Sequence, residues 1–183
     1  MSFVAANKFV YPDFWNYPPY FTLQPVPETR QKQLELWRAL ILSYCQHNRQ
    51  FIIYLDGNVD FPPFSNPSIN RHLSRQARVV VLDHAAHCGS GEWLDSKTKH
   101  SFLILWKSIQ VWADGLYSLA LENGLRNSVV TIDELQSGEY TRGTEYDQLP
   151  VEFLSRLIKE LQEKGKAKFF RGSRPDEEGV KFF

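Results

Sequence analysis

Apolar residues three or four positions apart follow Thr29 and form the clearest pattern in the chain. They are Leu34, Trp37, Leu40, Ile41 and Tyr44. Such spacing places side chains on one face of an α-helix, and a polar run from Arg30 to Gln33 precedes them. The pattern predicts an amphipathic helix that ends near His47.

A short strand and further helices are predicted in the rest of the first half. Residues 51–55 are apolar and β-prone and end in turn-forming residues, which is typical of a strand. A brief helix is expected within residues 67–73. A longer helix is predicted for residues 74–86, ended by Gly89, although the three valines within it suit a strand as well.

A β-hairpin closes the first half, and the same order of elements then begins again. The hairpin is expected from residues 92–95 and 101–106, which flank a polar turn. The later elements are predicted as a helix at 108–123, a strand at 128–132, a brief helix at 133–138, a helix at 150–164, and a hairpin of 168–171 with 180–183. The apolar positions expected to face inward are Val111, Trp112, Leu116, Leu119 and Ala120 in the first of these helices and Val151, Leu154, Leu157, Ile158 and Leu161 in the last.

Helices followed by a β-hairpin give the order of elements of a winged helix, and the chain shows this order twice. We therefore predict an α+β fold of tandem winged-helix domains, at residues 28–106 and 107–183. Residues 1–27 precede them as an N-terminal arm. Because this arm is rich in proline, we expect it to be extended rather than helical.

The arm is also dense in large rings. Its aromatic residues are Phe3, Phe9, Tyr11, Phe14, Trp15, Tyr17, Tyr20 and Phe21. One reading is that Tyr17 and Phe21 fold back to complete the core of the first domain. We expect this to be insufficient, because one small domain cannot bury so many rings. Proline-stiffened aromatic segments lose little entropy on binding, so the arm is interpreted as a docking peptide.

Charge disfavours nucleic acid as the main partner. Lys and Arg number 21 and so do Asp and Glu, which removes a general attraction to phosphates. Basic residues on the two candidate recognition helices are also diluted by acids: Arg75 and Arg78 precede Asp83, and Arg156, Lys159 and Lys164 alternate with Glu152, Glu160 and Glu163. A winged-helix regulator that binds nucleic acid stays open as the alternative function.

Cysteine content and hydropathy indicate the compartment. Cys45 and Cys88 are too few for a disulfide framework and suit a reducing environment, so we expect a cytoplasmic protein. The first residues lack the features of a signal peptide, and no stretch approaches the roughly 20 apolar residues of a membrane span. We expect the chain to be soluble.

The strongest candidate for catalysis or metal binding is the segment from Asp83 to Cys88. His84, His87 and Cys88 are competent zinc ligands, and His84 and Cys88 lie four residues apart. A further ligand must come from elsewhere, and no motif supports the nearest candidates in sequence, Cys45 and His47. Catalytic serine and phosphate-binding motifs are also missing, so we predict no enzymatic activity, no metal and no cofactor.

Five segments together resemble a known family. They are YPPYFTLQP at 17–25, ETRQKQLELW at 28–37, GEWLDSKTKHSFLILW at 91–106, NSVVTIDELQSGE at 127–139 and GVKFF at 179–183. Their combination and order are similar to the vacuolar protein sorting-associated protein 25 family, the subunit present in two copies in the endosomal sorting complex ESCRT-II. The resemblance covers essentially the whole chain.

The resemblance implies a non-catalytic scaffold built of two winged-helix domains, in sorting of ubiquitinated membrane cargo at multivesicular bodies. By it, the arm docks onto vacuolar protein sorting-associated proteins 22 and 36 of ESCRT-II, through Tyr17, Pro18, Pro19, Tyr20 and Phe21. The second domain would recruit charged multivesicular body protein 6 of ESCRT-III, and Glu134 is the residue expected to pair with a basic helix there. The implied location is the cytoplasm, with recruitment to the endosomal membrane through partners.

The chain departs from the family pattern in two places. The family usually has Phe where Tyr17 and Tyr20 stand, so the rings are kept and hydroxyls are added. Residues 83–90 replace a family stretch rich in Glu, Leu and Lys. Phe61–Phe64 repeats the Pro-Pro-x-Phe pattern of the arm and is expected to be a packed loop.

Overall fold

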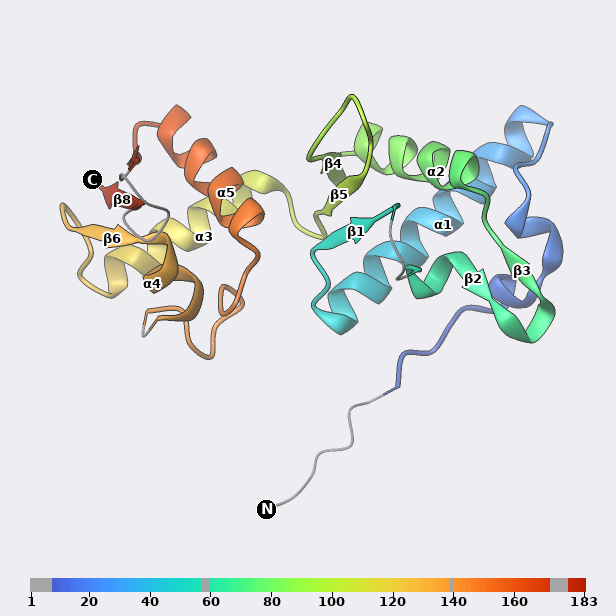
Figure 1. Ribbon diagram of the computed structural model, residues 1–183, viewed down its shortest axis with the longest axis horizontal. Coiled ribbons are helices and arrows are strands. Elements are labelled where there is room, and N and C mark those ends of the chain that lie inside the picture. Colours follow the sequence, from blue (N-terminus) through green and yellow to red (C-terminus); the bar gives the residue numbers. More distant parts are fainter. Residues whose placement is uncertain (1–7, 57–59, 139, 172–177) are drawn as a thin grey trace, which may run out of the picture. The chain divides into compact units, whose positions relative to one another are not determined.

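The chain folds as two compact units, Met1–Trp106 and Lys107–Phe183. The computed structural model describes residues 8–56, 60–138, 140–171 and 178–183. Each unit combines helices with a three-stranded antiparallel sheet (Figure 1). Helices and a β-hairpin recur in both units, as the predicted α+β fold of tandem winged-helix domains requires.

The first unit contains helices α1 (Pro27–Asn48) and α2 (Arg75–His87). Its sheet has the order β1-β5-β4, built from β1 (Ile52–Tyr54), β4 (Gly91–Trp93) and β5 (Ser101–Ile104). Two-residue strands β2 (Ser65–Asn66) and β3 (Arg71–His72) pair beside it, and 3-10 turns η3 (Pro62–Phe64) and η4 (Pro67–Ile69) flank them. The predicted brief helix at 67–73 is thus a single turn followed by a strand.

Helix α2 begins where its capping residue predicts. The Ser74 hydroxyl accepts a hydrogen bond from the Ala77 amide at 3.2 Å, which satisfies one of the free amides of the first turn. After the helix, Gly89 adopts a φ of +70°, a left-handed conformation that suits glycine. The helix therefore forms across the three valines, because both of its ends are specified by sequence.

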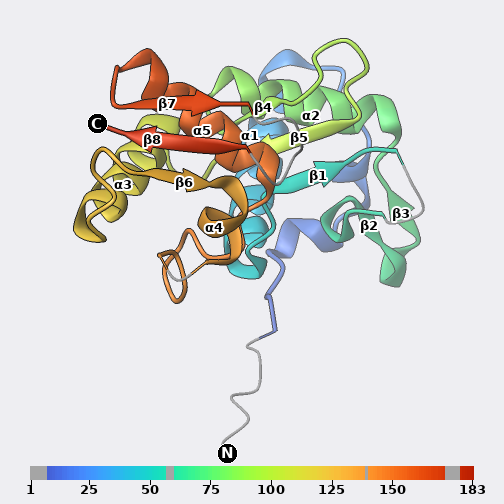
Figure 2. The ribbon, with the colours of Figure 1, turned by 60° about the vertical axis from the view of Figure 1, so that its left-hand side comes forward.

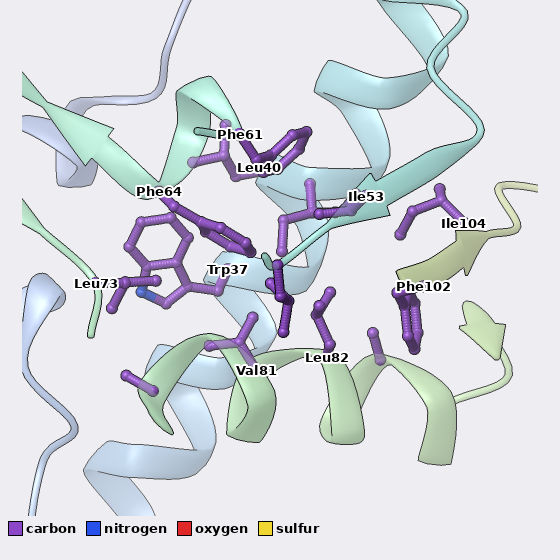
Figure 3. Packing of buried hydrophobic residues seen from close by; sticks show 14 of the residues in the cluster. Trp37, Leu40, Ile53, Phe61, Phe64, Leu73, Val81, Leu82, Phe102 and Ile104 are labelled. Carbon is purple, nitrogen blue, oxygen red and sulfur yellow. The ribbon is translucent and has the colours of Figure 1, made fainter. Parts of the chain in front are cut away.

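The core of the first unit lies between its helices and its sheet (Figure 3). Trp37 of α1 is fully enclosed, in contact with the ring of Phe64 from the loop after β1. Val81 and Leu82 of α2 and Phe102 of β5 complete the cluster on the other sides. The segment Phe61–Phe64 is the packed loop that its sequence predicts.

The second unit repeats the plan. Its helices are α3 (Ile109–Glu122), α4 (Ile132–Ser137) and α5 (Val151–Glu163), and its strands are β6 (Val129–Thr131), β7 (Ala167–Phe170) and β8 (Gly179–Phe182). Strand β8 lies between β6 and β7, as Figure 2 shows. The predicted hairpin is present, but residues 172–177 between its strands lie outside the described part.

Two inward-facing positions were predicted wrongly in this unit. Val111 and Val151 are exposed, because each stands in the first turn of its helix and points away from the core. Ile109 and Phe153 occupy the buried positions instead. Helical spacing identifies the buried face of a helix. Which residues of the first turn belong to that face depends on how the helix packs against its neighbours.

Candidate docking site on the N-terminal arm

The described part of the arm, from Lys8 to Val26, alternates extended backbone with single helical turns. Its turns are η1 (Asp13–Asn16) and η2 (Pro18–Phe21), and Tyr17 between them is extended, with φ −107° and ψ 110°. Pro18 and Pro19 occupy the first two positions of η2, where a fixed φ is compatible with a turn and the missing amide hydrogen costs nothing. Between Lys8 and Val26 the arm forms no α-helix, as predicted, but it is not continuously extended.

Most rings of the described arm pack against the first unit. The Phe21 ring stands edge-on to Trp37 at a centroid distance of 5.4 Å and is only 4% exposed. Phe14 contacts the same indole at 5.8 Å, and Phe9 contacts Tyr44 of α1 at 5.0 Å. Of the described arm rings only Phe21 is buried and Tyr17 is exposed, while the others are half-buried. The domain thus covers the rings only in part, which agrees with the expectation that it cannot bury them all.

Partial burial of Tyr11 changes the pKa of its hydroxyl. Burial, reinforced by the neighbouring Tyr44, raises the pKa of Tyr11 to about 12. The Tyr11 ring also stacks on Trp15 at 3.8 Å. This part of the arm therefore packs on the surface of the unit with its rings half-buried.

Hydrogen bonds from α1 fix the arm backbone around η2. The Gln33 amide nitrogen donates to the Tyr20 and Thr22 carbonyls at 2.9 and 2.8 Å, and its oxygen accepts from the Gln24 amide at 3.1 Å. The Trp37 indole nitrogen donates to the same Tyr20 carbonyl at 2.9 Å. Gln33 is buried, so these bonds satisfy a side chain that would otherwise be costly to enclose.

A second set of hydrogen bonds holds the arm around η1. The Trp15 indole nitrogen donates to the Pro63 carbonyl at 2.9 Å. The amide nitrogen of buried Asn66 donates to the Trp15 carbonyl at 2.8 Å. The arm is thus attached on both sides of Tyr17.

Tyr17 is the exposed aromatic side chain of the described part of the arm. It is 60% exposed and lies edge-on to the half-buried Tyr20, with ring centroids 6.1 Å apart. Pro19 is exposed beside them, and Pro18 is half-buried. The structure thus brings four of the five predicted docking residues to a surface and places the fifth, Phe21, in the core.

Sequence reasoning missed the residues that hold this surface. Gln33 was read as part of a polar run, although it stands four positions before Trp37 and hence on the same helix face. That spacing was the available signal. Trp15 and Asn66 lie 51 residues apart and carried no pattern that would have linked them.

Glu134 in the second unit has a structural task. Its carboxylate accepts from the Thr131 amide at 2.8 Å, while the Thr131 hydroxyl accepts from the Glu134 amide at 3.1 Å. This reciprocal pair is a capping box at the start of α4. The side chain is nevertheless exposed, so it also contributes negative charge to the surface.

Three arginines of the candidate recognition helices are paired with acids. Arg75 pairs with Asp56 at 2.9 Å and Arg78 with Asp60 at 2.6 Å. Arg156 lies 3.3 Å from Glu160 on its own helix. These pairs offset the positive charge that binding to phosphates requires.

Comparisons with known proteins place this geometry in context. A family model described as "ESCRT-II complex subunit" matches residues 14–150. The chain is 47% identical over 174 residues to "Vacuolar protein sorting-associated protein 25" of Arabidopsis thaliana, covering 95% of this chain and 96% of that protein.

Two solved structures are similar to this chain in fold. "Crystal structure of subunit VPS25 of the endosomal trafficking complex ESCRT-II" superposes with a TM-score of 0.82 at 25% identity, over 94% of this chain and 98% of the other. "The crystal structure of endosomal complex ESCRT-II (VPS22/VPS25/VPS36)" contains a chain with a TM-score of 0.80 at 26% identity and the same coverage.

Within the described residues, no helix is both long and apolar enough to cross a bilayer.

Proposed function

This chain belongs to the family of ESCRT-II complex subunits, as a relative of vacuolar protein sorting-associated protein 25, and from that membership we propose that it is a non-catalytic scaffold. Its arm docks onto the two larger subunits, vacuolar protein sorting-associated proteins 22 and 36. Its second winged-helix domain recruits charged multivesicular body protein 6 of ESCRT-III. The scaffold works in the cytoplasm and reaches the endosomal membrane through its partners.

The observation that carries this proposal is an exposed ring on a fixed backbone. Tyr17 faces solvent while Phe21 is enclosed in the core and Gln33 and Trp37 bind the intervening backbone. A segment that is ordered before binding loses less entropy on docking than a flexible peptide does. Aromatic side chains are also the usual centres of binding energy in protein interfaces. We assign direct contact with the larger subunits to Tyr17, Pro18, Pro19 and Tyr20, and a supporting role to Phe21.

Replacing Tyr17 by alanine is expected to weaken docking by about 2 kcal/mol, a loss of roughly 30-fold in affinity. The free energy of unfolding should stay within about 0.5 kcal/mol of the parent, because the side chain is mostly exposed. Titration of the full chain onto the co-expressed larger subunits, by calorimetry or interferometry, measures the first quantity, and denaturant unfolding measures the second.

Two variants make this test specific. Tyr17→Phe keeps the ring and should keep docking. Val10→Ala changes a side chain of the same arm that is 85% exposed and should also leave docking unchanged. Unaltered affinity of the Tyr17→Ala variant would refute the assignment of Tyr17 as a contact.

We propose that the exposed carboxylate of Glu134 attracts a basic helix of the ESCRT-III partner. The negative charge of Glu134 and its role in the capping box can be tested separately by two substitutions. Glu134→Gln retains an oxygen that can accept from Thr131, because glutamine also serves at this capping position. It should weaken binding of the partner helix about threefold at low salt, the size expected of one exposed ion pair, with an unchanged melting temperature.

The alanine variant at the same position serves as the contrast. Glu134→Ala also removes the hydrogen bond from the Thr131 amide to the carboxylate, which is one half of the capping box, and should lower the free energy of unfolding by about 1 kcal/mol. Fluorescence anisotropy with a labelled partner helix, at low and high salt, gives the affinities. Equal affinity of the Glu134→Gln variant and the parent at low salt would exclude the charge contribution.

A further inference from the structure

Three side chains with metal-binding atoms meet where α1 and α2 pack together in the first unit. They are Glu35 of α1, His84 of α2 and Cys88 at the C-terminal cap of α2. Glu35 Oε1 lies 2.8 Å from His84 Nε2, and Cys88 Sγ lies 3.6 Å from Nε2 and 3.9 Å from Oε1. The four-residue separation of His84 and Cys88 places both on one helix face, and the packing of α1 supplies the carboxylate.

The three atoms converge on one point rather than forming a chain. A cysteine nucleophile activated by histidine and a carboxylate needs the two partners on opposite ring nitrogens, so that a proton passes through the ring. Here both Cys88 and Glu35 approach the same nitrogen, Nε2. This arrangement argues against a relay and is the one expected of ligands around a shared ion.

The distances are close to those of a tetrahedral zinc site. Zinc with sulfur at about 2.3 Å and nitrogen or oxygen at about 2.05 Å would place the sulfur about 3.5 Å from the other two ligand atoms, and those two about 3.3 Å apart. The observed sulfur distances are within about 0.4 Å of this value. The distance between Nε2 and Oε1 would have to lengthen by about 0.5 Å for both atoms to bind the ion.

Neighbouring residues orient the Glu35 carboxylate and leave one side of the cluster exposed to solvent. Arg38 donates to the other oxygen, Glu35 Oε2, at 2.8 and 3.0 Å, and also to the Ser90 hydroxyl at 3.1 Å. Chiefly because of Arg38, and next because of His84, the pKa of Glu35 is below its usual value, so the carboxylate is charged. Arg38 fixes the ligand's orientation as outer partners of metal ligands do. Cys88 is exposed, which leaves one side for a water as fourth ligand.

We propose that Glu35, His84 and Cys88 bind one Zn²⁺ ion that joins α1 to α2. Mixed nitrogen, sulfur and oxygen donors suit zinc better than the oxygen-preferring cations magnesium and calcium. The sequence predicts no metal here, because its nearest candidate partners for His84 and Cys88 are Cys45 and His47. The fold instead provides Glu35, which is 49 residues from His84 in sequence.

The test is zinc binding by the full chain, purified with a chelator and kept reduced with a phosphine. Equilibrium dialysis against zinc chloride with elemental analysis should give one ion per parent chain. Cobalt(II) should give thiolate charge-transfer absorption, which reports a bond to Cys88. The variants Glu35→Gln, His84→Gln and Cys88→Ser should each lose at least about tenfold in affinity, the smallest loss expected even for outer partners of a metal ligand.

His87→Gln is the matched control, because His87 is exposed on the same helix and stands outside the cluster. It should bind zinc as the parent does. Zinc should raise the melting temperature of the parent and of His87→Gln but not of Cys88→Ser, whose exposed position makes unfolding by the substitution itself unexpected. Absence of zinc binding by the parent, or equal binding by all variants, would overturn the site and leave an ion-pair network between the helices.

Discussion

Replacing Trp37 by alanine is expected to lower the free energy of unfolding of the first unit by about 3–5 kcal/mol. The indole is fully enclosed and contacts the rings of Phe14, Phe21 and Phe64. Its removal leaves a cavity between α1 and the arm. It also leaves the Tyr20 carbonyl with one hydrogen bond fewer. Such a loss is a large part of the total stability of an ordinary domain.

The Trp37→Ala effect should include release of the arm, which distinguishes it from simple destabilisation. Denaturant unfolding measures the free energy, and hydrogen exchange reports protection of the Tyr20 and Thr22 amides. Trp112→Ala is the control, because Trp112 is equally enclosed in the second unit. It should destabilise that unit and leave arm protection unchanged. A loss below about 1 kcal/mol for Trp37→Ala would contradict the packing described here.

Replacing Phe21 by alanine is expected to reduce stability by about 3 kcal/mol and docking together with it. The ring fills the space beside Trp37 and is 4% exposed, so it cannot reach a partner without leaving the core. The expected pattern therefore differs from that of Tyr17→Ala, which should weaken docking alone. Melting temperature and affinity for the larger subunits, measured on the same preparations, separate the two roles.

Phe21→Leu provides the contrast for this prediction. Leucine refills much of the volume, so both stability and docking should fall by less than they do with alanine. A Phe21→Ala variant that is as stable as the parent and yet fails to dock would show that the ring contacts the partner directly. In that case the arm would have to change conformation on binding.

Most of the order of elements was predictable because it depends on local signals, but the paired strands β2 and β3 were not predicted. Ser74 and Ser108 cap their helices, and Gly124 and Gly165 stand in left-handed conformations just after helices end. The apolar spacing on α1 identified its buried face, including Trp37. Burial was predicted wrongly at helix ends, as at Val111. The spacing of apolar residues alone does not say which position in the first turn of a helix contacts the core.

The sequence singles out the run from Tyr17 to Phe21 as a candidate docking site, but it does not give the structure of that run. The run from Tyr17 to Phe21 is rich in proline and aromatic residues, and it resembles the docking motif of the family. Which of these residues faces solvent depends on turns η1 and η2 and on hydrogen bonds from Gln33. No periodic pattern encodes such contacts, because they join segments that meet only after folding.

The sequence by itself determined two helix-and-hairpin units, a ring-rich arm, a net charge of zero and membership in a family. These properties follow from local propensity, spacing and composition. The tertiary structure decided that Phe21 completes the core while Tyr17 stays exposed, and that Glu35 meets His84 and Cys88. The physical reason is the same in each case: the partners are distant along the chain, and only the packing of α1 against the arm and against α2 brings them into contact.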